Sequence, residues 1–135
     1  MAGGDGMGSG FLSAAGDRVL NSDACRLDIP EDLLDYIVRG IAAAIPTDSI
    51  YIFGSYARGE ARPSSDIDIF VVTSDDKERP LQYATMAAKE VADGIMEYGY
   101  DYDLLTCSRQ QHESRRRRRT SIDGIVSREG VKIYG

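Results

Sequence analysis

The chain has 135 residues, of which 42% are hydrophobic and 28% charged, and its net charge is −6. This length fits one compact domain with a real core. Residues 1–100 carry 8 Lys/Arg against 17 Asp/Glu, whereas residues 101–135 carry 8 against 5. This distribution argues against a broad basic surface for duplex nucleic acid, although one local basic patch exists.

The two cysteines, Cys25 and Cys107, lie far apart in the sequence and form no C-x-x-C motif. We expect free thiols in a reducing compartment, with neither a disulfide nor a zinc site. No apolar stretch approaches the roughly 20 residues that span a bilayer. The N-terminus lacks the basic and apolar regions of a secretory signal. We therefore expect a cytoplasmic protein that makes no membrane contact.

The predicted organisation is a glycine-rich extension over residues 1–24 and one domain over residues 25–135. The first ten residues contain five of the fourteen glycines, and such chain loses much entropy when it is ordered. Asp28 and Glu31 form a potential capping box for an amphipathic helix that ends before Pro46. The elements that follow are a strand over 49–53, a short helix within 54–61 and a second strand over 66–72.

The second half of the chain continues the same alternation. Pro80 is predicted to open an amphipathic helix that runs to about Tyr98. A third strand over 100–107, a short helix and a terminal strand follow. The predicted fold class is α+β, with a small mixed β-sheet backed by helices.

Two aspartates with one residue between them, Asp66 and Asp68, begin the second predicted strand. Residues two apart on a strand point to the same face, so both carboxylates project together. At about 5–6 Å they repel each other by roughly 3 kcal/mol at an effective dielectric of about 20. Mg²⁺, which takes one or two carboxylates plus substrate phosphates, fits such a pair. A solvated strand edge or a turn cap is the alternative for a lone D-x-D.

Neighbouring residues favour the metal site. Gly54-Ser55 lies between a strand and a short helix, so its amides and the Ser55 hydroxyl can meet a phosphate; no Walker A motif is present. Asp103 lies in the third strand, which can bring a third carboxylate to the same face. Three carboxylates can hold two divalent ions. Asp101 shares that face and remains a rival, but Asp103 lies inside the strand.

The stretch GSYARGEARPSSDIDIFVV, residues 54–72, resembles the signature of the polymerase-β-type nucleotidyltransferase superfamily. The closer likeness is to its minimal nucleotidyltransferases, and it runs from about Ile29 to Tyr134. The resemblance implies the nucleotidyltransferase fold, that of the polymerase-β-like catalytic domain. The nucleotide-binding residues that it implies are Gly54, Ser55, Arg58 and Ser65. The metal ligands and catalytic acids that it implies are Asp66, Asp68 and Asp103.

The same resemblance implies a reaction. A nucleoside monophosphate, AMP from ATP, would pass to an acceptor hydroxyl with release of pyrophosphate. The hydroxyl would attack the α-phosphorus in line, with two Mg²⁺ ions, or Mn²⁺ in their place, neutralising charge. Asp103 matches the acid that often activates this hydroxyl.

The resemblance also suggests a partner. Members that act on small molecules or polynucleotides usually carry another domain for the acceptor, and we find none here, so we expect another chain to share that surface. Minimal members are often paired with a helical HEPN-type protein in toxin–antitoxin systems. AMP transfer to a tyrosine of such a partner is the specific prediction, and a homo-oligomer is a further expected assembly. The competing class is a non-catalytic nucleotide-binding antitoxin that acts by stoichiometric binding; an antibiotic-modifying enzyme is disfavoured by the short chain.

Three further features are interpreted conservatively. Arg115–Arg119 is an uninterrupted arginine run, for which a solvated loop is the default. Contact with RNA, with nucleotide phosphates or with an acidic partner is the alternative, and nucleic acid is not favoured. His112 is interpreted as a surface residue without a ligand partner. Tyr98, Tyr100 and Tyr102 are predicted to pack on the sheet face opposite the acids.

Overall fold

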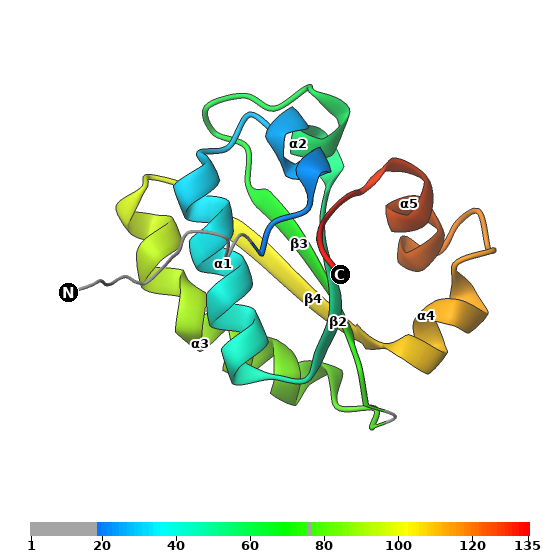
Figure 1. The fold of residues 1–135 in the computed structure, drawn as a ribbon. Helices are drawn as coiled ribbons and strands as arrows, with labels where there is room; N and C mark the ends of the chain where they lie inside the picture. The colour runs from blue at the N-terminus through cyan, green and yellow to red at the C-terminus, as the bar shows by residue number, and fades with distance from the viewer. Residues whose placement is uncertain (1–18, 76) are drawn as a thin grey trace.

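A computed structural model of the protein describes residues 19–75 and 77–135, which include a four-stranded sheet of order β4-β3-β2-β5 (Figure 1). The strands are β2 (Thr47–Phe53), β3 (Ile67–Thr73), β4 (Tyr102–Ser108) and β5 (Val131–Tyr134). β2 pairs antiparallel with β3 and with β5, whereas β3 and β4 run parallel. The sheet is mixed, and the predicted α+β class is confirmed.

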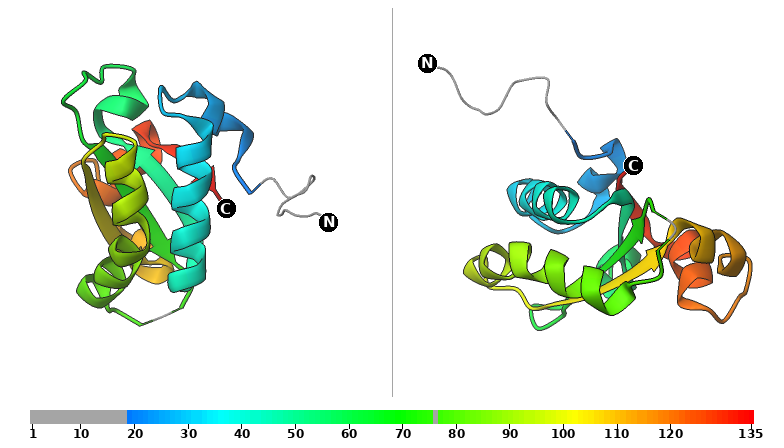
Figure 2. Two further views of the ribbon diagram at one scale, coloured as in Figure 1. Left: turned by 90° about the vertical axis from the view of Figure 1, so that its left-hand side faces the viewer. Right: turned by 90° about the horizontal axis from the view of Figure 1, so that it is seen from below.

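Helices cover both faces of this sheet. α1 (Glu31–Ala44) and α3 (Pro80–Glu97) lie on one face, and α4 (Arg109–Arg115) and α5 (Ile122–Glu129) lie on the other (Figure 2). The remaining helices are the short α2 (Gly54–Arg58), which leaves β2 directly, and the 3₁₀ helix η2 (Ser22–Arg26), which contacts β5.

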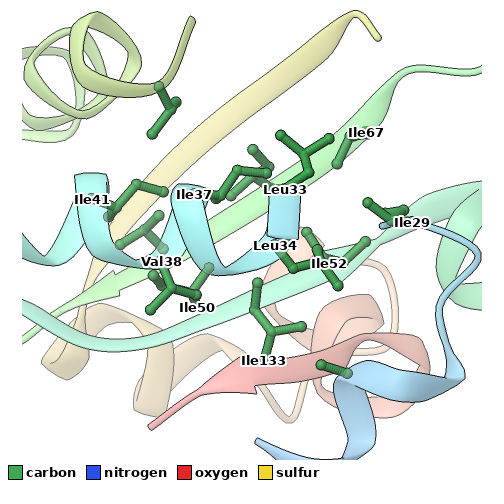
Figure 3. Close-up of a cluster of buried hydrophobic side chains, with 14 of the residues drawn as sticks. Ile29, Leu33, Leu34, Ile37, Val38, Ile41, Ile50, Ile52, Ile67 and Ile133 are labelled. Carbon is green, nitrogen blue, oxygen red and sulfur yellow. The ribbon is translucent and has the colours of Figure 1, made fainter. Parts of the chain in front are cut away.

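The larger hydrophobic core lies between the sheet and α1 with α3 (Figure 3). The side chains that α1 buries are Leu33, Leu34, Ile37, Val38 and Ile41. Those that the strands bury against them include Ile50, Ile52, Ile67 and Ile133. Each such side chain contributes about 1.5–3 kcal/mol on burial. α1 and α3 pack closely because Gly94 leaves room for the Tyr36 ring, which a Cβ would approach to 2.1 Å.

β3 sends alternate side chains to the two faces, as a strand must. Those in the larger core are Ile67, Ile69 and Val71. Those in a second cluster, with Cys107 and Val126, are Phe70 and Val72. Asp68 has the parity of the second set, so its carboxylate lies on the face of α4 and α5.

The predicted elements are found with small shifts at their ends. β3 begins at Ile67, so Asp66 directly precedes the strand. α1 begins after Pro30 without a side-chain cap, so the predicted capping box does not form. Tyr100 and Tyr102 pack against the larger core, opposite the acids as predicted, whereas Tyr98 is 46% exposed.

The sequence analysis missed α4 and was wrong about His112, which is only 5% exposed. α4 folds back against the sheet and brings the His112 ring to centroid distances of 5.7 Å from Phe70 and 6.1 Å from Tyr51. Its Nδ1 lies 2.9 Å from Oδ1 of the buried Asp123 in α5. Cys107 also faces Asp123; burial, followed by the charge of Asp123, raises the pKa of its thiol to about 12. This polar cluster ties α4 and α5 to the sheet.

Most of the predicted extension, residues 1–18, lies outside the described residues. The part that is described contacts the domain: Leu20 and Ala24 are buried, and the Asn21 amide donates to the Ile133 carbonyl at 2.8 Å. Across the described residues, helices are too short or too polar to cross a membrane. Cys25 is an exposed free thiol and Cys107 a buried one.

His112→Ala is expected to lower the free energy of unfolding by about 1–3 kcal/mol, because it removes a hydrogen-bond partner of the buried Asp123 side chain. Urea unfolding at neutral pH measures this change. Gln110→Ala, an exposed position on the same helix, is the control and should alter stability by less than about 0.5 kcal/mol. Equal stability of the two variants would show that the pair does not hold α4 in place.

Candidate active site

β3 and β4 place two carboxylates side by side. Asp68 pairs with Asp103 in the parallel register, and neighbouring strands lie about 4.8 Å apart. Paired residues project to the same face, so the two side chains lie next to each other. Asp101 precedes β4, and its carbonyl accepts a hydrogen bond from the Ile67 amide at 2.9 Å. Asp103, and not its rival Asp101, therefore stands opposite Asp68.

The third acid, Asp66, is exposed at the end of a closed turn. The Arg62 amide donates to Oγ of Ser65 at 2.8 Å, and the Ser65 amide donates to the Arg62 carbonyl at 2.9 Å. Ser65 thus fixes the backbone that leads to Asp66. Its hydroxyl still has a proton to donate to a phosphate oxygen.

The pKa of the Asp68 carboxyl is raised. Partial burial is the largest cause, followed by the negative charges of Asp103 and Asp66, while Arg58 acts in the opposite direction. Both other acids act on the charge of Asp68, so the three carboxylates lie near one another. Bringing such charges together is unfavourable until a cation binds.

Gly54 allows the chain to leave β2 directly beside Asp68. The β2–β3 register pairs Phe53 with Asp68, and Gly54 follows in the left-handed region with φ 71°. A Cβ on Gly54 would lie 2.1 Å from Oδ2 of Asp68. Only glycine meets both conditions without strain. The Gly54-Ser55 turn and Asp68 therefore form one contiguous surface.

Arg58, at the end of α2, supplies positive charge close to the acids. Its Nε lies 2.9 Å from Oε1 of Glu60, and its Nη1 lies 3.9 Å from Oε1 of Glu129. The hydrogen bond to Glu60 is the largest cause that raises the pKa of Arg58, and Asp68 adds to it. The sequence analysis missed Glu129, because only the packing of α5 beside α2 brings it near Arg58.

The donor set fits a divalent cation that also binds the substrate. Within residues 19–75 and 77–135, no group of three or more His, Cys, Asp or Glu side chains forms a ready-made metal cage. Mg²⁺ does not need one, because it commonly takes one or two carboxylates and completes its shell with waters and phosphates. Asp68 and Asp103, with Asp66 beside them, offer this arrangement of oxygen ligands.

A cavity of about 320 Å³ adjoins the turn before Asp66. Its lining residues are Asp28, Tyr56, Ala61, Arg62, Pro63, Gly99 and Tyr100. The rings of Tyr56 and Tyr100 meet edge to face at a centroid distance of 6.1 Å. Burial, then the charges of Tyr100, Asp28 and Asp66, raises the pKa of Tyr56, so its hydroxyl stays neutral.

Comparison with known proteins decides the family. The model of the nucleotidyltransferase domain family matches residues 34–127, most of the chain. The chain belongs to this family. No curated protein matches it significantly. As a family member the protein is a nucleotidyltransferase, in agreement with the geometry of the acids and of the Gly54-Ser55 turn.

Solved structures share the fold of this nucleotidyltransferase. A crystal structure of a toxin–antitoxin complex with AMP-PNP includes a chain that is 24% identical, with a TM-score of 0.53 over 79% of this chain and 74% of that chain. A mutant of the toxin–antitoxin complex MntA-HpeT gives 21% identity and a TM-score of 0.50, over the same shares of the two chains. A nucleotidyltransferase-like protein from Sulfolobus solfataricus is 26% identical, with a TM-score of 0.46 over 69% of this chain and 76% of that chain.

Gly54→Ala is expected to impair nucleotide binding, because the added methyl group displaces the Asp68 carboxylate. Gly59→Ala is the matched control: Gly59 has the same φ of 71°, but its Cβ would have no neighbour within 4 Å. Both variants should lose about 1–2 kcal/mol of stability from the left-handed backbone. Calorimetry with AMP-PNP and Mg²⁺ should show weaker binding for Gly54→Ala alone. Equal binding by both variants would contradict the contact with Asp68.

Asp68→Asn is expected to raise the melting temperature of the protein in EDTA at pH 7. The folded-state pKa of Asp68 lies above its unfolded value, so the carboxyl destabilises the folded state once the pH rises above the unfolded pKa, and this cost is complete above the folded pKa. The gain should shrink as the pH falls and disappear below a pH of about 3, where this carboxyl is protonated in both states. Thermal melts across this pH range test the claim. A gain independent of pH would rule out charge repulsion as its cause.

Proposed function

We propose that this nucleotidyltransferase transfers AMP from ATP to a hydroxyl of a separate protein and releases pyrophosphate. The observation that carries the proposal is the in-register pair Asp68 and Asp103, set directly against the Gly54-Ser55 turn. This arrangement puts ligands for a metal-bound triphosphate and a backbone surface for its phosphates in one place. Family membership supports the same reaction class.

The phosphate side of the site is formed by the turn after β2. Gly54 lacks a side chain, so a phosphate can approach the backbone amides closely. The Ser55 hydroxyl and the Ser65 hydroxyl are further donors. Arg58 contributes a guanidinium that Glu60 and Glu129 hold in position while its charge acts on the acid cluster.

The acids form the reacting side. Asp66, Asp68 and Asp103 would hold Mg²⁺, which when bound neutralises the triphosphate and favours the ionised form of the attacking hydroxyl. Asp103 is exposed and accepts the hydroxyl proton. The acceptor oxygen then forms a bond to the α-phosphorus, and the bond from that phosphorus to the pyrophosphate oxygen breaks.

The acceptor that we propose is a tyrosine of a helical, HEPN-type partner, for which this protein is the antitoxin. β4 is an edge strand and both Asp66 and Asp103 are exposed, so a large acceptor can reach the acids from solvent. Two structural relatives with TM-scores of 0.50 or more come from toxin–antitoxin complexes, one with AMP-PNP. These relatives support the choice of a protein acceptor.

Asp103→Asn is expected to reduce label transfer at least about 100-fold, because it removes the carboxylate that holds Mg²⁺ and accepts the hydroxyl proton. The assay incubates the protein with ATP labelled at the α-phosphate, Mg²⁺ and the protein encoded next to it. Asp101→Asn is the matched control, with the same chemical change two residues away, and should retain transfer. Asp66→Asn should behave like Asp103→Asn.

Two results would contradict this proposal. If Asp101→Asn abolishes transfer and Asp103→Asn does not, the assignment of the acids is wrong. If no label ever reaches the partner and neutralisation of its toxicity survives Asp66→Asn, the protein acts instead by stoichiometric binding. Peptide mapping of the labelled partner identifies the modified side chain, and a labelled residue other than tyrosine rejects the proposed acceptor.

A further inference from the structure

Five consecutive arginines, Arg115–Arg119, join α4 to α5 and have no part in the proposed reaction. Arg115 is the last residue of α4, and the others form the connection to α5; all five are exposed. We refer to these five residues as the arginine link. The connection lies at the outer edge of α4 and α5, away from the sheet (Figure 1). Its side chains are therefore accessible to a ligand from solvent.

Internal hydrogen bonds hold the backbone of the arginine link in place. The Ser121 hydroxyl lies 2.8 Å from the Arg115 carbonyl and 3.1 Å from the Arg118 carbonyl, and it donates to this pair. The Arg128 guanidinium donates to the Arg119 carbonyl at 2.8 Å. These three carbonyl oxygens are therefore occupied within the protein and do not repel an anion outside it.

The backbone of the arginine link packs closely against the start of α5. The Gly124 amide donates to Oγ of Ser121 at 2.9 Å, which caps the helix. A Cβ on Gly124 would lie 1.9 Å from the Arg118 carbonyl oxygen, so only glycine permits the contact. The arginine link thus follows one fixed path, and its side chains are presented from a defined scaffold.

Most of the positive charge on the arginine link lacks a carboxylate partner. Considering the residues that the structure describes, Arg116 pairs with Glu113 at 2.9 Å, and no ion pair forms at the other four arginines. Like charges held this close repel one another. A polyanion relieves that repulsion and releases its own counterions when it binds.

The chemistry of the arginine link favours phosphate over a protein surface. Specific protein interfaces combine arginines with apolar and aromatic anchors, whereas the link itself contains only arginines. Guanidinium groups match phosphate oxygens in a bidentate manner. A phosphodiester backbone presents such oxygens at regular spacing, so several arginines can be neutralised at once.

The charge of the rest of the chain favours a single strand over a duplex. Residues 1–100 carry 17 acidic against 8 basic residues, so a rigid duplex on the link would press further phosphates against an acidic protein. A flexible single strand can touch the link alone. We propose that the arginine link binds the phosphate backbone of single-stranded nucleic acid. This activity is independent of nucleotidyl transfer.

The test measures fluorescence anisotropy of a fluorescein-labelled RNA of 20 nucleotides and mixed sequence, with the full chain and no nucleotide, between 50 and 200 mM NaCl. A single-stranded DNA of the same sequence separates RNA from DNA as the source of the backbone. Each neutralised phosphate contributes about −0.7 to the slope of log K against log salt. Four or five arginines give a slope of about −3, or an affinity loss of about 60-fold over this range.

The variant combines Arg117→Gln, Arg118→Gln and Arg119→Gln. It should bring the slope to about −1, because three phosphate contacts are lost, and weaken RNA binding at 50 mM NaCl at least tenfold. Its melting temperature should stay close to that of the wild type, because the hydrogen bonds of the link use carbonyl groups. If it fails to fold, the triple lysine variant at the same positions should keep the slope near −3.

The matched control combines Arg26→Gln, Arg79→Gln and Lys89→Gln, which removes the same charge from exposed positions elsewhere, and should bind RNA like the wild type. Four results would overturn the proposal. The first two are a wild-type slope near zero and an equal loss of RNA affinity in the control and in the link variant. The other two are tighter binding of a 20-base-pair duplex than of the single strand, and tighter binding of a 20-residue polyglutamate than of the RNA. The last result would assign the link to an acidic protein instead.

Discussion

Repulsion between carboxylates at one end of the sheet is the constraint around which the structure is arranged. The parallel register holds Asp68 opposite Asp103, and the β2–β3 register sets Asp68 against Gly54. Two carboxylates at about 5 Å cost roughly 3 kcal/mol at an effective dielectric of about 20. The backbone hydrogen bonds of two strand pairs and the packing of β3 resist this force. The raised pKa of Asp68 is its electrostatic consequence.

The two faces of the sheet differ in what they contribute: one buries the larger core and the other carries Asp68. The larger core beneath α1 and α3 buries most of the apolar side chains, so it supplies most of the folding energy. The face that carries Asp68 has a smaller apolar cluster and a buried polar contact between His112 and Asp123. Acids at the edge of that face displace little of the apolar packing, because most of the buried apolar side chains lie on the other face.

Positively charged side chains lie at two separate places in the fold. Arg58 is held between Glu60 and Glu129, close enough to act on Asp68 but far enough to leave the carboxylates to a cation. The arginine link lies apart from these acids, beyond α4 and α5, on a fixed backbone. The separation keeps the proposed site for a metal-bound nucleotide apart from the proposed polyanion surface on one acidic chain.

The sequence alone determined the order of the main elements and the family, because helical and strand periodicities are local and the Gly-Ser and Asp-x-Asp residues lie within 15 positions of each other. It also predicted one face for Asp66 and Asp68, since a strand alternates, although β3 begins only at Ile67. Only the tertiary structure placed Asp103, and not Asp101, opposite Asp68, because this pairing depends on the register of two strands far apart in the chain. The same holds for Glu129 beside Arg58 and for the buried His112, whose partners are supplied by packing that no local pattern encodes.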